Sequence, residues 1–398
     1  MHSNTIMSQL LTLLPRHQFD QAVSDFGGDH YVKKFSTWNQ LTVLLYAQAS
    51  GKNSLRDIQT ALGTQEPKLY HLGLPAVKRS TLADANAKRD SRIMEKLFYR
   101  LLERCQAIAP KHQFRFKHPV RCFDSTTVDL CLELFPWAKF RQTKGAVKLH
   151  CQLDLRGQIP SFVVMTDGKC SDIRAVRSFL DLIPDSIYVV DRGYIDFDWL
   201  SRIDESQAFF VTRAKDNIDY RITGQQEIPL KNGLLFDRTI ELAGPLTSKK
   251  YSKPLRLIGY FDTETSVTYE FLTNNFKLAA LSIAKIYKAR WHVELFFKWI
   301  KQHLRIKTFL GTTKNAVLTQ VWAAMSYFLL LAYIRFQCRF QRSLFLLHRL
   351  VQNTLLDRLS LIDLLRLPEK KCRSCGTRSL NYASHSGFLR TPVILASN

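Results

Sequence analysis

The chain has 398 residues, enough for two or three domains, each with its own hydrophobic core. Hydrophobic residues make up 46% of it and charged residues 23%, which excludes an intrinsically disordered chain. Lys and Arg number 57 against 34 Asp and Glu, giving a formal net charge of +23. Such a surface attracts polyanions, of which nucleic acid is the commonest. A generally basic soluble protein with no such partner is the alternative interpretation.

The first part of the chain, residues 1–112, is predicted to be a helical N-terminal domain. Helices are expected at 36–51, where a serine can cap the start and a glycine ends the pattern, at 54–62, and from 78 to about 105. Short helices joined by glycine turns, with basic residues at the junctions, suit a DNA-binding domain of the helix-turn-helix type. An ordinary helical bundle is the alternative.

The pattern then changes to that of a central α/β domain over residues 113–310. Three strands followed by helix, strand, helix and strand is the order of a ribonuclease-H-like mixed sheet. Residues 216–276 interrupt it with further strand-like runs, which we interpret as a β-rich insertion. The expected strands of the core lie at 120–130, 148–155, 159–166, 186–191 and 208–213, its helices at 172–183 and 197–205, and the strands of the insertion at 218–222, 234–242, 255–261 and 268–272.

Residues 311–398 are predicted to be a helical C-terminal region, with helical structure running from about 278 to 365 and an irregular end. The uncharged stretch 316–334 is interrupted by Thr319, Gln320 and Ser326, which favours a buried core helix over a membrane span. The eight cysteines include one CxxC, at Cys372 and Cys375, with no second pair to complete a zinc site. Free thiols and the lack of a signal-peptide pattern indicate a cytoplasmic protein without a membrane partner.

Two aspartates fall at strand positions where a ligand can bind. Asp124 lies inside a predicted strand, where a carboxylate is costly to bury unless it meets a metal or another cation. Asp191 ends an apolar run, and ligands sit at the carboxyl ends of strands in open α/β sheets. On neighbouring strands the two could share a divalent cation. Each alone could equally be an ordinary aspartate at a turn.

A third group of polar residues lies on one predicted helix. Tyr287, Arg290, Glu294 and Lys301 have offsets of 0, 3, 7 and 14, which place them within an arc of about 60° on one helix face. The alternative is that Arg290 and Glu294 form a plain i, i+4 ion pair on a solvated face, with Lys301 as a surface lysine.

These residues carry a resemblance to DDE transposases of the insertion-sequence family four, which belong to bacterial mobile elements. The family signature Tyr-x2-Arg-x3-Glu-x6-Lys is matched without a gap, and the resemblance covers roughly residues 30–335. The matches are Tyr287, Arg290, Glu294 and Lys301 for the signature, Asp124-Ser-Thr for the first aspartate motif, Asp191-x-Gly-Tyr for the second, and Arg213-x-Lys215-x-Asn after the following strand.

The resemblance implies that Asp124, Asp191 and Glu294 form a metal-binding triad for Mg²⁺ or Mn²⁺, with two ions bound. Hard carboxylate oxygens suit these metals, and two metals can clamp the attacking and leaving oxygens of phosphoryl transfer. Trp291 matches an aromatic position associated with bases near the cut, although core packing is an alternative for this residue. The residues implied to bind DNA are Tyr287, Arg290, Trp291, Lys301, Arg213 and Lys215.

The function implied by the resemblance is DNA transposition: metal-dependent cleavage at transposon ends, a hairpin intermediate, and strand transfer into target DNA. The expected partners are the terminal inverted repeats and target DNA, with a homodimer assembled on the DNA ends in the bacterial cytoplasm, at the nucleoid. Two alternatives stay open. One is a ribonuclease-H-like nuclease that only hydrolyses nucleic acid; the other is a non-catalytic DNA-binding protein derived from a transposase.

Overall fold

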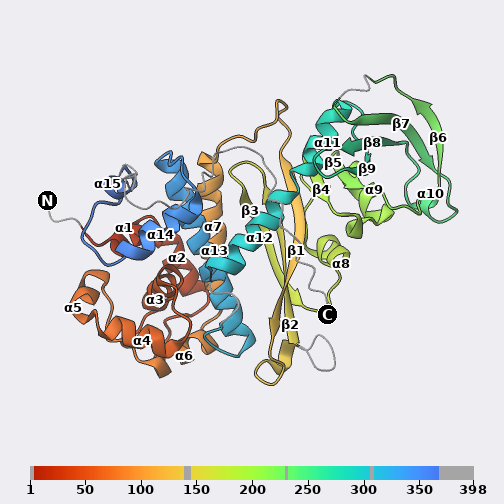
Figure 1. The fold of residues 1–398 in the computed structure, drawn as a ribbon. Coiled ribbons are helices and arrows are strands. Elements are labelled where there is room, and N and C mark those ends of the chain that lie inside the picture. Colours follow the sequence, from red (N-terminus) through yellow and green to blue (C-terminus); the bar gives the residue numbers. More distant parts are fainter. Residues whose placement is uncertain (1–3, 139–144, 229–231, 305–308, 367–398) are drawn as a thin grey trace, which may run out of the picture.

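A computed structural model describes residues 4–138, 145–228, 232–304 and 309–366 (Figure 1). In the described residues a single mixed sheet runs through the molecule, with helices packed on it. The helices within residues 6–108 and 314–366 lie together at one side of the sheet and are called the helical unit below. The predicted α/β class with a ribonuclease-H-like core is confirmed. Residues 367–398, and with them the Cys372–Cys375 pair, lie outside the described residues.

The core of the sheet has the strand order β3-β2-β1-β4-β5. The first three strands form an antiparallel meander, and β4 and β5 then add in parallel beside β1. All five predicted strands are present, although β2 begins earlier than expected. Their bounds are Val120–Leu130 for β1, Gly145–Asp154 for β2, Ile159–Asp167 for β3, Ile187–Val190 for β4 and Phe209–Arg213 for β5.

The β-rich insertion continues this sheet, so the nine strands are hydrogen-bonded in one order. Its last strand, β9, pairs antiparallel with β5, with Arg213 opposite Phe271. The insertion therefore pairs with the polar end of β5 and extends the core sheet. Its elements are β6 at Tyr220–Gln225, β7 at Leu234–Leu242, the short helix α10 at Thr247–Lys250, β8 at Leu255–Asp262 and β9 at Val267–Thr273.

The N-terminal helices differ from expectation at one point. The helix expected over 78–105 is two helices, because Arg89 between them adopts an extended conformation with φ −74° and ψ 131°. The Arg89 guanidinium donates hydrogen bonds to the carbonyl of Phe35 and to Gln40, which fixes the bend. The bounds are Ile6–Thr12 for α1, Arg16–Asp25 for α2, Thr37–Ser50 for α3, Leu55–Gly63 for α4, Glu66–Leu69 for α5, Arg79–Lys88 for α6 and Arg92–Ile108 for α7.

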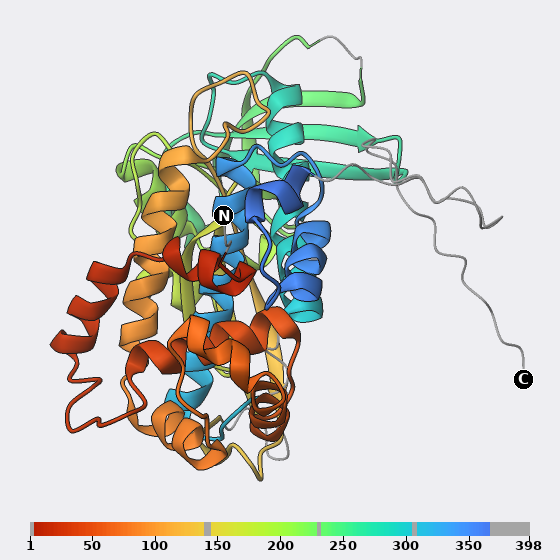
Figure 2. The same ribbon diagram turned by 90° about the vertical axis from the view of Figure 1, so that its left-hand side faces the viewer.

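The long apolar stretch forms α13, Lys314–Gln337, at the centre of the helical unit. It runs alongside α7 (Figures 1 and 2), where the rings of Phe98 and Trp322 lie 5.2 Å apart and Cys105 contacts the carbonyl of Leu329. Its length and hydropathy would suit a membrane span, but 89% of the most apolar window is buried inside the protein. The prediction of a core helix is confirmed. The division of the chain at 310/311 stays a prediction.

The remaining helices cover the sheet and complete the helical unit. The helix α12 crosses β1 and β2 (Figure 1) and follows α11 after a break at Ala289 and Arg290. This crossing brings the signature residues over the strand that carries Asp124. The bounds are Asp172–Phe179 for α8, Phe197–Glu205 for α9, Ala280–Lys288 for α11, Trp291–His303 for α12, Leu344–Thr354 for α14 and Leu361–Arg366 for α15.

Candidate active site

The two aspartates lie side by side on adjacent parallel strands. Cys122 of β1 is paired with Val189 of β4, so Asp124 and Asp191 stand at the same level two residues further along. An Asp124 carboxylate oxygen accepts a hydrogen bond from the backbone N–H of Ser125 at 2.8 Å. Asp191 caps the turn after β4 in the same way, accepting from the N–H of Arg192 at 2.7 Å. The strand order thus places two anchored carboxylates at one edge of the core.

The helix α12 adds Glu294, and Arg290 joins it to β1. Arg290 Nη1 donates a hydrogen bond to Asp124 Oδ2 at 3.2 Å, and Arg290 Nη2 donates one to Glu294 Oε1. The side chains of Arg290, Asp124 and Glu294 are only 17%, 22% and 32% exposed. The alternative of an exposed helix pair is therefore wrong, because the guanidinium bridges two carboxylates from different elements in a half-buried site.

The electrostatics of Asp124 indicate a surplus of negative charge. Burial is the main cause that raises the pKa of Asp124, and the carboxylates of Glu294 and Asp191 raise it further. The N–H of Ser125 and the guanidinium of Arg290 oppose these effects. Additional positive charge at this position would therefore stabilise the ionised triad.

The donor set fits a hard divalent cation, since it consists of carboxylate oxygens. Among the described residues, however, no three acidic, His or Cys side chains converge closely enough to hold a metal as they stand. Arg290 lies between two of the three carboxylates and supplies one positive charge against their two negative charges. The sequence suggested the triad but gave no sign of this bridging contact.

The other predicted DNA-binding residues surround these carboxylates on two sides. Tyr287 packs against Phe271 of β9 with ring centroids 4.8 Å apart, and burial raises its pKa. Arg213, at the end of β5, lies over the ring of Tyr269 at 5.2 Å. Lys215 lines a hollow beside the turn that follows Asp191. The end of β5 and the α11–α12 junction thus both supply polar groups, and the rings of Tyr269 and Phe271 connect Arg213 with Tyr287.

Trp291 and Lys301 lie on α12. The Trp291 residue is 56% exposed, so the alternative of core packing is wrong, and Val293, Phe297 and Ile300 fill the core instead. Lys301 shares the helix face of Glu294 and lies seven residues beyond it, about 10 Å along the axis. Trp291 is thus accessible at the surface, while Lys301 continues the helix face of Glu294 toward the end of α12.

A second charged cluster behind β1 was missed from the sequence. Asp172, at the start of α8, lies 2.9 Å from Lys148 Nζ and 3.4 Å from His150 Nδ1. His150 is fully buried, and its other ring nitrogen hydrogen-bonds with Thr166 at 2.9 Å. His150 and Lys148 pair in register with Ser125 and Thr127, next to Asp124. Polar residues alternating on an otherwise apolar strand were the signal that could have revealed this cluster.

Comparisons with known proteins agree with this geometry. Residues 115–329 match the family model described as the transposase DDE domain, and residues 2–75 match a domain of unknown function (DUF4372). A protein of Sinorhizobium fredii named as a transposase is 34% identical over 254 residues, spanning 63% of this chain and 69% of that protein. A protein of Geobacillus stearothermophilus, named as the transposase for insertion sequence element IS5377, is 30% identical, spanning 68% of this chain and 70% of that protein.

A further similarity is to a solved piggyBac transposase synaptic complex with hairpin DNA. It has a TM-score of 0.44 and 10% sequence identity, and covers 92% of this chain and 81% of that one.

The matched domain covers more than half of the chain and contains all three carboxylates. The chain therefore belongs to the DDE transposase family, and its activity is that of a DNA transposase. Enzymes of this family act on DNA and generally use divalent metal ions. The resemblance inferred from the sequence motifs is confirmed at the level of the family.

Proposed function

We propose that this transposase cuts DNA at the terminal inverted repeats of its own element and joins the ends to target DNA, with Asp124, Asp191 and Glu294 as metal ligands. The observation that carries this proposal is the contact of Asp124 and Glu294 with one guanidinium, beside Asp191 on the adjoining strand. Two Mg²⁺ or Mn²⁺ ions suit these oxygen ligands, and when bound they would activate water and stabilise the attacking and leaving oxygens.

The residues of the chain then bind and orient the DNA. The planar fork of Arg290, held between the two carboxylates in this structure, can grip the scissile phosphate at two points. Lys301 adds a point charge further along α12, and Tyr287, Arg213 and Lys215 contact the backbone on the other sides. Trp291 is exposed beside Arg290 and offers a ring on which a base near the cut can stack.

The proposed reaction has four stages. Hydrolysis of one strand at the element's end frees a 3′-OH, which attacks the opposite strand and leaves a hairpin on the element. A second water reopens the hairpin, and the resulting 3′-OH attacks target DNA. The hairpin stage is proposed from the resemblance to the insertion-sequence family four.

The remaining parts of the proposal concern assembly and location. Residues 1–112 recognise the terminal repeat, while 113–310 carry the chemistry and 311–398 form the C-terminal region. Two copies of the chain, one on each DNA end, form the active homodimer. The enzyme works in the bacterial cytoplasm, at the nucleoid, without a membrane partner. The support for this location is the basic surface and the buried position of α13.

The test uses a duplex that carries one end of the element, with Mg²⁺ and an unrelated target duplex, resolved on a denaturing gel. Asp124→Ala, Asp191→Ala and Glu294→Ala should each lower cleavage about a hundredfold or more while retaining DNA binding. A hairpin and a strand-transfer product are expected with the wild type. Nicking without any transfer product would indicate a hydrolytic nuclease, and near wild-type cleavage by Glu294→Ala would show that the triad is wrongly assigned.

A further inference from the structure

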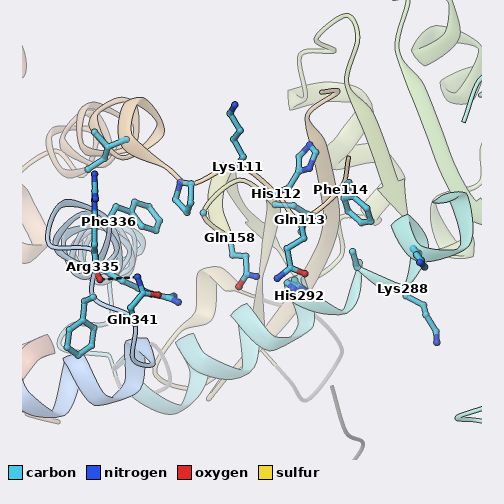
Figure 3. A pocket seen from close by; sticks show the side chains of 18 residues that line it. Lys111, His112, Gln113, Phe114, Gln158, Lys288, His292, Arg335, Phe336 and Gln341 are labelled. Atoms are coloured by element: carbon cyan, nitrogen blue, oxygen red, sulfur yellow. Dashed lines mark hydrogen bonds between the residues drawn. The ribbon is translucent and has the colours of Figure 1, made fainter. Parts of the chain in front are cut away.

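A large open pocket lies on the side of α12 that faces away from the carboxylates. It has a volume of about 930 Å³ and is lined by the segment after α7, the β2–β3 turn, the α11–α12 junction and the end of α13 (Figure 3). His292, which lines it, is two residues before Glu294 on α12 and so lies about 200° around the helix. A phosphate held at the triad therefore does not occupy this pocket.

The floor of the pocket is also displaced from the triad along the sheet. Leu155 lines it, and the N–H of Leu155 donates to the carbonyl of Val120. Val120 is four residues before Asp124, which corresponds to about 13 Å along the strand. The pocket therefore lies beside the candidate active site but does not include it, and its lining extends beyond residues 113–310 to the segment after α7 and the end of α13.

The shape of the pocket is fixed by close packing at the β2–β3 turn. Gly157 in this turn has φ +69°, and a Cβ there would lie 2.7 Å from the ring of Phe336 on α13. Only a glycine allows the turn to seat against the helix in this way. The cavity is thus built into the junction between the sheet and the helical unit, as binding pockets commonly are.

The charges that line the pocket are all of one sign. Among its 18 lining residues, all within the described parts of the chain, five are Lys or Arg and none is acidic. Lys288 is paired with Asp262 at 3.0 Å. For the other four cations the described residues provide no ion-pair partner; they are Lys111, Lys285, Arg335 and Arg339.

Arg335 shows why this arrangement favours an anionic ligand. The side chain extends from α13 into the pocket region (Figure 3), and burial lowers its pKa. A partly buried cation without a counter-charge carries a desolvation cost that a bound anion would offset. Three glutamines, Gln113, Gln158 and Gln341, also line the pocket and can donate hydrogen bonds to anionic or sugar oxygens.

We propose that this pocket binds the sugar-phosphate backbone of a DNA segment other than the one cut at the triad. Cations from three separate segments, which are the one after α7, α11 and the end of α13, are spread over a wide opening. This arrangement matches a polyanion with repeated charges better than one small anion. The inference rests on the proposed function only in taking DNA as the polyanion. The bound segment is either a continuation of the element's end or the target duplex, which offer the same phosphates.

The experiment measures binding of the full chain to fluorescent duplexes without divalent metal, between about 50 and 200 mM salt. The test variants are Lys111→Gln, Lys285→Gln and Arg339→Gln, alone and combined, with Arg335→Gln added last because this residue is half-buried. Lys249→Gln, an exposed lysine on α10, removes the same charge elsewhere and serves as the matched control. Melting curves establish that each variant is folded.

Two arms separate the possible sources of the phosphates. In one arm the labelled duplex carries the element's end; in the other an unrelated duplex is added to protein already saturated with that end. Each lost phosphate contact should reduce the slope of log K against log[salt] by about 0.9 and weaken binding about fivefold near physiological salt. A loss confined to the first arm identifies the element's own DNA, and a loss in the second identifies the target.

The proposal is overturned if the folded triple variant matches Lys249→Gln in slope and affinity in both arms. Since no chemistry occurs without metal, the result is independent of cleavage. A wild type that never cuts DNA would contradict the proposed function while leaving a pocket-specific loss of binding intact. Conversely, if the wild type cuts DNA but the pocket variants bind DNA as Lys249→Gln does, only the proposal of a DNA-binding pocket is refuted.

Discussion

The two sides of α12 differ in how their charges are balanced. On the triad side, Arg290 is held by Asp124 and Glu294, so its position is set before DNA arrives. On the pocket side, four cations have no ion-pair partner among the described residues. Paired charges hold Arg290 in one position, whereas the unpaired cations of the pocket can each contribute separately to the binding of an anion. A single substitution of Arg290, where the charges are paired, should therefore lower cleavage strongly. In the pocket, where the cations are unpaired, each substitution should weaken DNA binding by one further small step.

The largest effect is expected for Arg290→Ala. The variant should lose cleavage about a hundredfold or more, because the two-point phosphate contact is lost and two carboxylates are left without their counter-charge. The pKa of Asp124, already raised by burial, should rise further because Arg290 no longer lowers it. Arg290→Lys should restore activity only in part, since an ammonium cannot reproduce the planar fork. Cleavage rates and melting curves for both variants provide the measurement.

The melting temperature shows whether activity is lost because the phosphate contact is missing or because the variant does not fold. Arg290→Ala should remain folded, and Glu241→Gln, which breaks the exposed pair with Arg221, should have almost no effect on either rate or melting temperature. Full activity in a folded Arg290→Ala protein would refute the phosphate contact. It would also remove the contrast between the two sides of α12.

Most of the fold could be predicted from the sequence because local patterns agree with the tertiary arrangement. The alternating pattern of β1 and the apolar run of β4 locate the strands that carry Asp124 and Asp191. The break between α6 and α7 could not be predicted, since it depends on contacts from Arg89 to residues some fifty positions earlier. The pairing of β9 with β5 is likewise a long-range contact that local pattern does not encode.

For the site, the helical spacing of Arg290 and Glu294 predicted that they share a face. The contact from Arg290 to Asp124 could not be predicted, because it joins residues 166 positions apart. The basic pocket was missed for the same reason: its cations are scattered in sequence and meet only when the β2–β3 turn packs against α13. Net charge alone showed that such a surface exists but not where it lies.

An intermediate effect is expected for the basic residues that begin α6, Lys78 and Arg79, which are exposed and unpaired among the described residues. If α6 reads bases, Lys78→Ala combined with Arg79→Ala should reduce the preference for the terminal repeat by about 1–3 kcal/mol per lost base contact. Competition between terminal-repeat and unrelated duplexes measures that preference. An unchanged preference would refute a reader role for this helix end. Point substitutions are preferable to deleting residues 1–112, because α7 packs against the core helix α13.

The smallest effect is expected for the paired charges behind β1. Burial alone would raise the pKa of Asp172, but His150, Ser125 and Lys148 together hold it well below its ordinary range. A carboxyl whose pKa is lower in the folded state stabilises the fold at neutral pH, and that contribution is lost as pH falls below the unfolded value of about 3.9. Asp172→Asn should therefore destabilise the protein at pH 7 by about 1–2 kcal/mol, the lower part of the range for a charged contact because the side chain is partly exposed.

The dependence on pH is the part of this prediction that a merely steric effect would not reproduce. The difference in melting temperature between wild type and Asp172→Asn should be largest above about pH 5 and should shrink steadily as the pH is lowered toward 3. Glu241→Gln is the control, since both partners of its ion pair are exposed and no such difference is expected at any pH. A difference that stays constant across the range would mean that Asp172 acts through packing and not through its charge. If the two proteins melt together even at pH 7, the buried cluster does not stabilise the strand that positions Asp124.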